Sequence, residues 1–258
     1  MYEKLFQPAR IGSLEIKSRL IMPAMNSHYA DDGHYFTDQA LHYYGERALG
    51  GFGLLITEFL CVSEEGLAYP MQAAIYDDCF IPSLSRLTKR IHDNGSKIFA
   101  QLHHAGRVQG KGSTSLMAVG AGSIPDKVNR IPVHELDEAE ISELEQKFID
   151  AAVRAKKAGF DGVEVHGAHG YLLAQFLSKS VNKRTDRYGG SISGRARLVC
   201  EIVHGIKAAC GKDFPVSVRT SGEEGFDGGN TIEDAIAQSL LFEAAGADAI
   251  HVSHGIAI

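Results

Sequence analysis

The sequence predicts an α/β protein of the TIM (β/α)8-barrel type that is incomplete, with about six βα units present. A pattern of a helix, a glycine, a short apolar strand and a polar residue recurs along the chain, as in ALGGFGLLITE, KAGFDGVEVH and EAAGADAIHVSH. Its strands are near-continuous apolar runs, which suit parallel strands buried on both faces. Alternating strands and helices indicate a parallel sheet with right-handed crossovers. The 258 residues fit one domain of this kind.

The elements follow in order along the chain. Residues 6–17, FQPARIGSLEIK, predict a hairpin that turns at Gly12 and Ser13 and closes the barrel bottom. Six strands are expected at 19–25, 52–58, 97–102, 162–166, 215–219 and 248–252. Apolar residues at helical spacing predict helices at 80–94, 137–159, 194–210 and 231–246. Asp137 and Glu140 have the spacing of a capping box.

Residues 105–136 form the one long segment outside this repeat. They are polar and rich in Gly, Ser and Pro. A loop this long inside a compact domain is usually functional, so we expect a lid, with a disordered insertion as the alternative. The whole chain, 1–258, is expected to be a single barrel domain.

Composition excludes several classes of function. The net charge of −6 comes with no basic cluster, so we expect no nucleic-acid partner. No apolar run approaches the ~20 residues of a membrane helix. The four cysteines contain no CxxC pair and predict reduced thiols in a cytoplasmic protein, neither a disulfide framework nor a metal knuckle. A small-molecule substrate is the remaining expectation.

Polar residues stand where the predicted strands end. In a parallel barrel the active site lies at these carboxyl ends, and packing alone does not require His, Gln or Arg there. Their convergence predicts an enzyme, and because no GxGxxG follows the first strand, a Rossmann fold is disfavoured. The residues are Asn26, His28, Glu58, Gln101, His103, His104, Glu164, His166, Arg219, His251 and Ser253.

His166, His169 and Tyr171 lie together in the segment EVHGAHGYL, just past a strand. From residue type alone, the two histidines have three open interpretations: zinc ligands, hydrogen-bond donors to a developing oxyanion, or structural side chains. Tyr171 is a competent proton donor to a carbanion-like centre, or else a half-buried aromatic.

Gln101 and Arg219 also end predicted strands. Gln101 offers both a donor and an acceptor, which suits the edge of a heterocycle or a contact to a loop backbone. Arg219 is a permanent cation suited to an anionic cofactor ring or phosphate, or to an ion pair with Glu164.

Longer motifs show a resemblance to a known family. The stretch HGAHGYLLAQFLSKSVNKRTDRYGGSISGRARL, with QLHHAGR and PVSVR, resembles the Old Yellow Enzyme family of FMN-dependent ene-reductases. The likeness runs from LFQPARIG to the last residue. It is nearest to the branch that holds 2,4-dienoyl-CoA reductase and enoate reductases.

The resemblance implies a set of flavin contacts. The segment Pro23, Ala24, Met25 and Asn26 is similar to the family stretch that lies along the flavin. Asn26 stands where relatives often have Thr or Cys. Phe59 stands where relatives have a small residue, so it is expected to crowd the cofactor. Gln101 matches the residue at the pyrimidine edge of the flavin, and Arg219 matches the arginine near flavin N1.

The resemblance also implies a mechanism. NADH or NADPH reduces FMN, and the reduced flavin passes hydride to the β-carbon of an unsaturated carbonyl compound. His166 and His169 match the pair that grips the carbonyl, and Tyr171 matches the proton donor. The competing interpretations are a metal-dependent barrel hydrolase built on the two histidines and a non-catalytic, truncated fragment.

The six strands are two fewer than a closed barrel needs. The chain is therefore expected to be C-terminally truncated, or to take its missing strands from another chain through an open edge, as in a homo-oligomer. We expect FMN to bind weakly or not at all to this chain alone, because the strands that hold its phosphate in the family are not among the six. Any 4Fe–4S cluster is expected only in a further C-terminal region.

Overall fold

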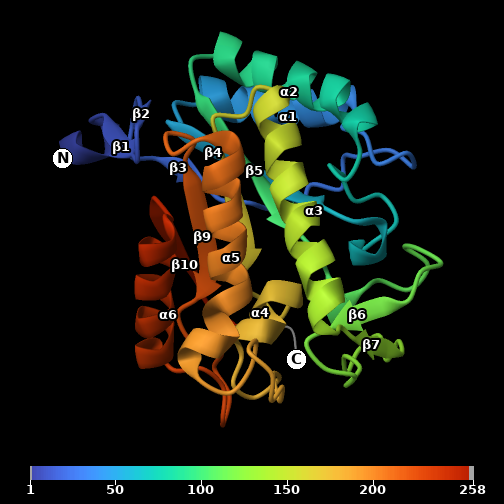
Figure 1. Cartoon of the computed structure of the whole chain (residues 1–258). Helices are drawn as coiled ribbons and strands as arrows, with labels where there is room; N and C mark the ends of the chain where they lie inside the picture. Colours follow the sequence, from blue (N-terminus) through green and yellow to red (C-terminus); the bar gives the residue numbers. More distant parts are fainter. Residues whose placement is uncertain (1, 256–258) are drawn as a thin grey trace.

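The protein is built on one curved sheet of six parallel strands. The computed structural model describes residues 2–255. The strands are β3 Ile21–Met22, β4 Leu54–Cys61, β5 Lys97–His103, β8 Gly162–Gly167, β9 Val216–Ser221 and β10 Ala249–Ser253. They neighbour one another in chain order, so β3 and β10 are the two edges (Figure 1). The prediction of an incomplete (β/α)-barrel is confirmed.

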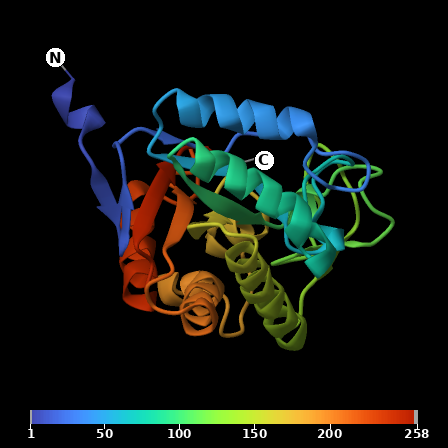
Figure 2. The same ribbon diagram turned by 90° about the horizontal axis from the view of Figure 1, so that it is seen from above.

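Helices cover the outer face of the sheet (Figure 2). They are α1 Asp38–Leu49, α2 Ile81–Asp93, α3 Glu138–Lys157, α5 Ile192–Cys210 and α6 Ile232–Ala245. The short helix α4, Leu172–Leu177, follows β8 and lies past the carboxyl ends of the strands (Figure 1). All six residues of α4 are buried. A helix buried all round has no amphipathic stripe, so periodicity in the sequence does not indicate it.

The predicted strand at 19–25 is much shorter in the structure. Only Ile21 and Met22 pair with β4. Pro23 has no N–H to give to a ladder, and the chain leaves the sheet there. In contrast, β4 extends beyond its predicted end to Cys61, and its register against β5 shifts between Ile56 and Phe59.

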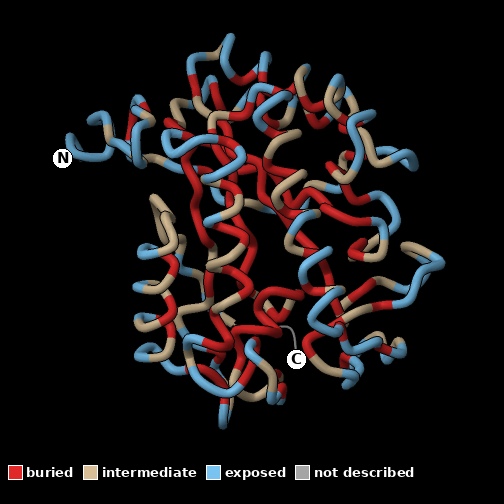
Figure 3. Tube along the Cα trace, in the orientation of Figure 1, coloured by how far each residue is buried: buried red, intermediate tan, exposed pale blue. Residues whose placement is uncertain are grey.

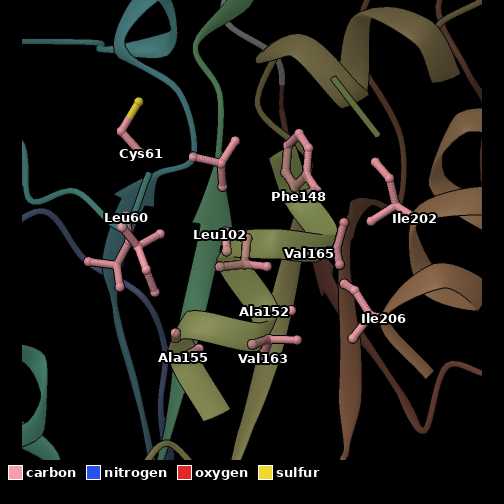
Figure 4. Packing of buried hydrophobic residues seen from close by; sticks show 14 of the residues in the cluster. Leu60, Cys61, Leu102, Phe148, Ala152, Ala155, Val163, Val165, Ile202 and Ile206 are labelled. Carbon is pink, nitrogen blue, oxygen red and sulfur yellow. The ribbon is translucent and has the colours of Figure 1, made fainter. Parts of the chain in front are cut away.

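The main core lies between the sheet and its helices. Phe148 of α3 and Ile202 of α5 pack on the outward side chains Val163 and Val165 of β8 (Figure 4). Figure 3 shows the resulting continuous buried layer. Because side chains alternate along a strand, Glu164 faces the inside of the open barrel. This alternation separates the core from the polar interior.

The segment 6–17 contains a two-stranded hairpin. Strand β1, Ala9–Ile11, pairs antiparallel with β2, Leu14–Ile16, across a turn in which Gly12 has a φ of +56°. A side chain at Gly12 would also collide with Asp248. Ile16 packs in a small second cluster with residues of β4 and β5. The hairpin thus lies on the inner side of the sheet, near where the strands begin.

Residues 105–136 are partly structured. They contain a short turn, η4 Gly106–Val108, and two strands, β6 Ala118–Gly120 and β7 Val133–Glu135, which pair in parallel. The carboxylate of Asp126 accepts hydrogen bonds from the backbone N–H groups of Val128 and Asn129. The segment lies beside the lower end of α3 in Figure 1.

The edge of the sheet carries an apolar surface. Ile232, Ile236 and Leu240 of α6 are each more than half exposed, and Val252 of the edge strand β10 is 66% exposed. Among the described residues, no helix is both long and apolar enough to cross a membrane.

Helix α3 begins with a complete capping box. The Asp137 side chain accepts from the backbone N–H of Ala139 and Glu140, and Glu140 accepts from the N–H of Asp137. We expect Asp137→Ala to lower the free energy of unfolding by about 1 kcal/mol, because two N–H groups of the first turn lose their acceptor. Asp137→Asn keeps a capping oxygen and is the matched control. Equal urea midpoints for the Ala and Asn variants would contradict this.

Candidate active site

The candidate site lies on the inner face of the sheet, toward the carboxyl ends of the strands. Alternation along β5, β8 and β9 points Gln101, His166 and Arg219 inward, and β10 adds His251 and Ser253. Residues from distant parts of the sequence therefore meet in one place. Strand pairing sets their spacing, since His166 is directly opposite Arg219 in the β8–β9 register.

His166, His169 and Tyr171 form a compact group. The ring of His166 lies 5.2 Å from that of His169 and 5.3 Å from that of Tyr171, between centroids. His169 has a φ of +61°, an unusual backbone for a residue other than glycine. Tyr171 immediately precedes α4, whose Leu172 N–H donates to the carbonyl of His104 at 3.0 Å. The start of α4 thereby fixes Tyr171 against β5.

Both histidines of this group are neutral near pH 7. Burial lowers the pKa of His166 well below its ordinary value, and the charge of Arg219 adds to this. Burial and Arg219 also lower the pKa of His169 to about 4. Burial raises the pKa of the Tyr171 phenol. The site therefore holds two uncharged imidazoles and one protonated phenol.

Ser253 connects His169 with Arg219. The Oγ of Ser253 lies 2.6 Å from Nε2 of His169 and 3.4 Å from Nη2 of Arg219. A guanidinium only donates, so the Ser253 oxygen accepts from Arg219 and its proton is free to go to Nε2 of His169. When Ser253 donates in this way, the His169 proton lies on Nδ1, which is then a hydrogen-bond donor. In the sequence, Ser253 is only one of several polar strand ends.

Several buried polar atoms of the site have no hydrogen-bond partner among residues 2–255. They include Oε1 of Gln101, Nδ1 of His166 and Nε of Arg219. Unpaired buried polar atoms are costly unless a ligand satisfies them. The polar edge of a heterocycle such as a flavin would fit these groups, since Gln101 offers an acceptor, His166 an imidazole nitrogen and Arg219 a cationic donor.

The hydrogen bonds of Gln101 and Arg219 differ from those that their structural alternatives predict. Gln101 donates through Nε2 to Glu164 at 2.7 Å, not to a loop backbone. Arg219 donates to the carbonyl of Ala24 at 3.3 Å, and the ion pair with Glu164 is not formed. Burial lowers the pKa of Arg219, and the charge of Glu164 opposes this. Arg219 thus reaches the segment Pro23–Asn26 across the open barrel.

The segment Pro23–Asn26 lies at the surface of the inner face. Its Met25 is 47% exposed. The chain immediately after it is held by Glu58, whose carboxylate accepts from the N–H and the hydroxyl of Ser27. Arg219 therefore holds the segment at Ala24, and Glu58 holds the residue that follows it.

Phe59 lies on the Tyr171 side of the site. Its ring stacks on His103 with centroids 4.0 Å apart and contacts Tyr171 at 5.5 Å. The ring is buried. The register shift in β4 directly before Phe59 places the side chain in this aromatic wall.

The metal interpretation of the histidines lacks a ligand set. Across residues 2–255, no group of three or more His, Cys, Asp or Glu residues is arranged to hold a metal ion. Glu164, one candidate third ligand, is engaged with Gln101 and His251. His103, the other, stacks on Phe59.

The lowered pKa of His169 predicts a pH dependence of stability. The ordinary pKa of 6.5 falls to about 4 in the fold, so the unfolded chain takes up a proton first as pH falls. The free energy of unfolding is therefore independent of His169 above about pH 6.5. It falls as the pH is lowered from about 6.5 to 4, because protonation then favours the unfolded chain. His169→Asn, which tolerates the positive φ, should flatten this part of the curve of urea midpoint against pH. An unchanged curve would show that His169 has no such shift.

The fold is that of a (β/α)-barrel protein, and its candidate site lies at the carboxyl ends of the strands. The chain belongs to the NADH:flavin oxidoreductase / NADH oxidase family, whose model matches residues 4–258. Old Yellow Enzymes are among its structural neighbours: a homologue from Zymomonas mobilis has a TM-score of 0.88 and 30% identity, covering 96% of this chain and 73% of that one.

Longer relatives match nearly the whole chain. An NADH oxidase of Thermoanaerobacter brockii is 42% identical over 99% of this chain and 40% of its own length. A cinnamate reductase of Clostridium sporogenes is 38% identical, over 97% of this chain and 41% of its own. A 2-naphthoyl-CoA reductase in complex with 2-naphthoyl-CoA has a TM-score of 0.94 and 32% identity, over 99% and 41%. The chain thus spans about two fifths of these proteins.

Proposed function

We propose that the protein is an FMN-dependent oxidoreductase that reduces the C=C bond of an α,β-unsaturated carbonyl compound, with NAD(P)H as electron source. The observation that carries this proposal is the pair of neutral imidazoles, His166 and His169, beside the protonated phenol of Tyr171. The similarity to a cinnamate reductase and a 2-naphthoyl-CoA reductase supports an enoate or an enoyl thioester as substrate class.

The residues that would hold FMN are Gln101, Arg219 and the segment Pro23–Asn26. When bound, FMN supplies the hydride. His166 and His169 would hold the carbonyl oxygen of the substrate and stabilise the negative charge that develops on it. Both imidazoles are uncharged, so this stabilisation comes from hydrogen bonding, with the Nδ1 proton of His169 as one donor.

Tyr171 would give its proton to the α-carbon. Burial raises the pKa of its phenol, so the group is fully protonated before the reaction. A carbanion-like centre is a strong enough base to take this proton, whereas water at neutral pH is not. Phe59 and His103 contact the Tyr171 ring and fix its place.

Residues 105–136 would form a lid that shapes the choice of substrate. Gly106, near its start, lies so close to α4 that a side chain there would meet Cα of Leu172. The segment is therefore packed directly against the residue that follows Tyr171. A loop placed there can exclude water from the proton transfer.

The experiment is a titration of the purified protein with FMN, followed by an anaerobic assay with cinnamate, an enoyl thioester and a cyclic enone. Saturable quenching of flavin fluorescence and NAD(P)H-dependent loss of the alkene are expected. A flavin-free protein that binds metal and hydrolyses esters would overturn the proposal in favour of the hydrolase. Arg219→Gln should weaken FMN binding, while Arg197→Gln, at a partly exposed position on α5, should not.

A further inference from the structure

Glu164 is a buried carboxylate on the inner face of β8. It is inaccessible to solvent. Three donors from three other strands converge on it: Nε2 of Gln101 at 2.7 Å, Nδ1 of His251 at 2.9 Å and Oγ of Ser217 at 3.3 Å. A buried carboxylate is costly unless its oxygens are hydrogen-bonded, and these bonds offset that cost.

These contacts fix the orientation of the Gln101 side-chain amide. A carboxylate can only accept, so the amide nitrogen of Gln101 must face Glu164. The amide oxygen is then turned away from Glu164. This oxygen, Oε1, is one of the buried atoms that have no partner in the described part of the chain.

We propose that Glu164 is a positioning residue that presents the Gln101 carbonyl oxygen as a hydrogen-bond acceptor to an N–H group on the pyrimidine ring of the flavin. The inference rests on the proposed function. It adds that Glu164, which does not itself touch the ligand, determines whether Gln101 accepts from the ligand or donates to it. Glu164 acts through Gln101, and it cannot be replaced by an amide of the same shape.

The reason lies in how the two Glu164 oxygens are used. Oε2 accepts from both Ser217 and His251, and Oε1 accepts from Gln101. In Glu164→Gln, the new amide oxygen keeps both present bonds when Ser217 and His251 remain donors, so the new NH2 group faces Gln101. Two NH2 groups cannot bond to each other, so the Gln101 amide turns over and presents its NH2 group to the ligand. The substitution therefore inverts the contact.

The test measures the Kd for FMN by fluorescence quenching. Glu164→Gln should weaken binding about 10-fold or more, since the NH2 group of Gln101 then faces the N–H group of the flavin. Gln101→Glu should also weaken it, because two carboxylates would meet. The double variant Gln101→Glu/Glu164→Gln restores an outward acceptor, because the carboxylate introduced at position 101 takes the new NH2 with one oxygen and presents the other. Its Kd should return to within about threefold of wild type.

Asp161→Asn is the matched control. It removes a mostly buried carboxylate that directly precedes the same strand, where Asp161 contacts His92 and Lys97. It should lower stability but leave the Kd for FMN unchanged. A merely structural role of Glu164 predicts that the double variant binds no better than the single ones.

Two outcomes overturn the inference: Glu164→Gln binds FMN as wild type does, or the folded double variant stays as weak as the single variants. If Glu164→Gln does not fold, the double variant decides by the same criterion. Absence of saturable FMN binding by the wild-type protein is a different result, because it overturns the proposed function together with this inference.

Discussion

Replacing Tyr171 with Phe is expected to slow reduction of the alkene about 10²–10⁴-fold, the usual contribution of a positioned proton donor. Reduction of the bound flavin by NAD(P)H should persist. Phe has the same ring, so the contacts with Phe59, His103 and His166 are kept and only the proton is lost. The two half-reactions should therefore separate.

Rapid mixing distinguishes the two half-reactions. One experiment follows bleaching of the flavin by NAD(P)H, and the other follows reoxidation of the reduced protein by the unsaturated substrate. Tyr188→Phe is the matched control, because Tyr188 is a buried tyrosine that bonds to Glu201 on α5. Equal losses in both half-reactions, or in neither, would refute the role of Tyr171.

Replacing His169 with Ala is expected to slow reoxidation by the unsaturated substrate about 10²–10³-fold, the usual cost of one oxyanion donor. His169→Asn should retain most of the rate. The Asn amide can donate to the carbonyl, and Asn tolerates the φ of +61° at this position better than most residues. The Ala variant loses the donor and is also strained.

The comparison of Ala with Asn separates hydrogen bonding from folding. Urea unfolding of both variants shows whether the Ala variant is still folded under assay conditions. His204→Ala, at an exposed histidine on α5, is the control for the removal of an imidazole. If Asn is as slow as Ala while both are folded, the donor role of His169 is wrong.

Much of this architecture can be predicted from the sequence. The apolar runs place five of the six strands within a few residues, because burial on both faces leaves a continuous signal. The capping box at Asp137 is equally local. The strand beginning at residue 19 is overestimated, since the effect of Pro23 on the ladder outweighs its apolar neighbours.

The candidate site can be predicted from the sequence only in part. Residue type and strand ends indicate Gln101, His166 and Arg219, because a polar residue at the end of a buried strand stands out. The position of Phe59 is not predictable, since it depends on the register shift of β4 against β5. Nor do the residues alone choose among metal binding, oxyanion binding and a structural role for the histidines.

By itself, the sequence determined the class of fold, the order of the strands and the residues that end them. These depend on periodicity and on local backbone chemistry. Only the tertiary structure decided which polar atoms are paired. Ser253 lies 84 residues from His169, and Gln101 lies 63 residues from Glu164. Such bonds exist only when the sheet curves and sets neighbouring strands in register, so donor and acceptor roles follow from the folded chain.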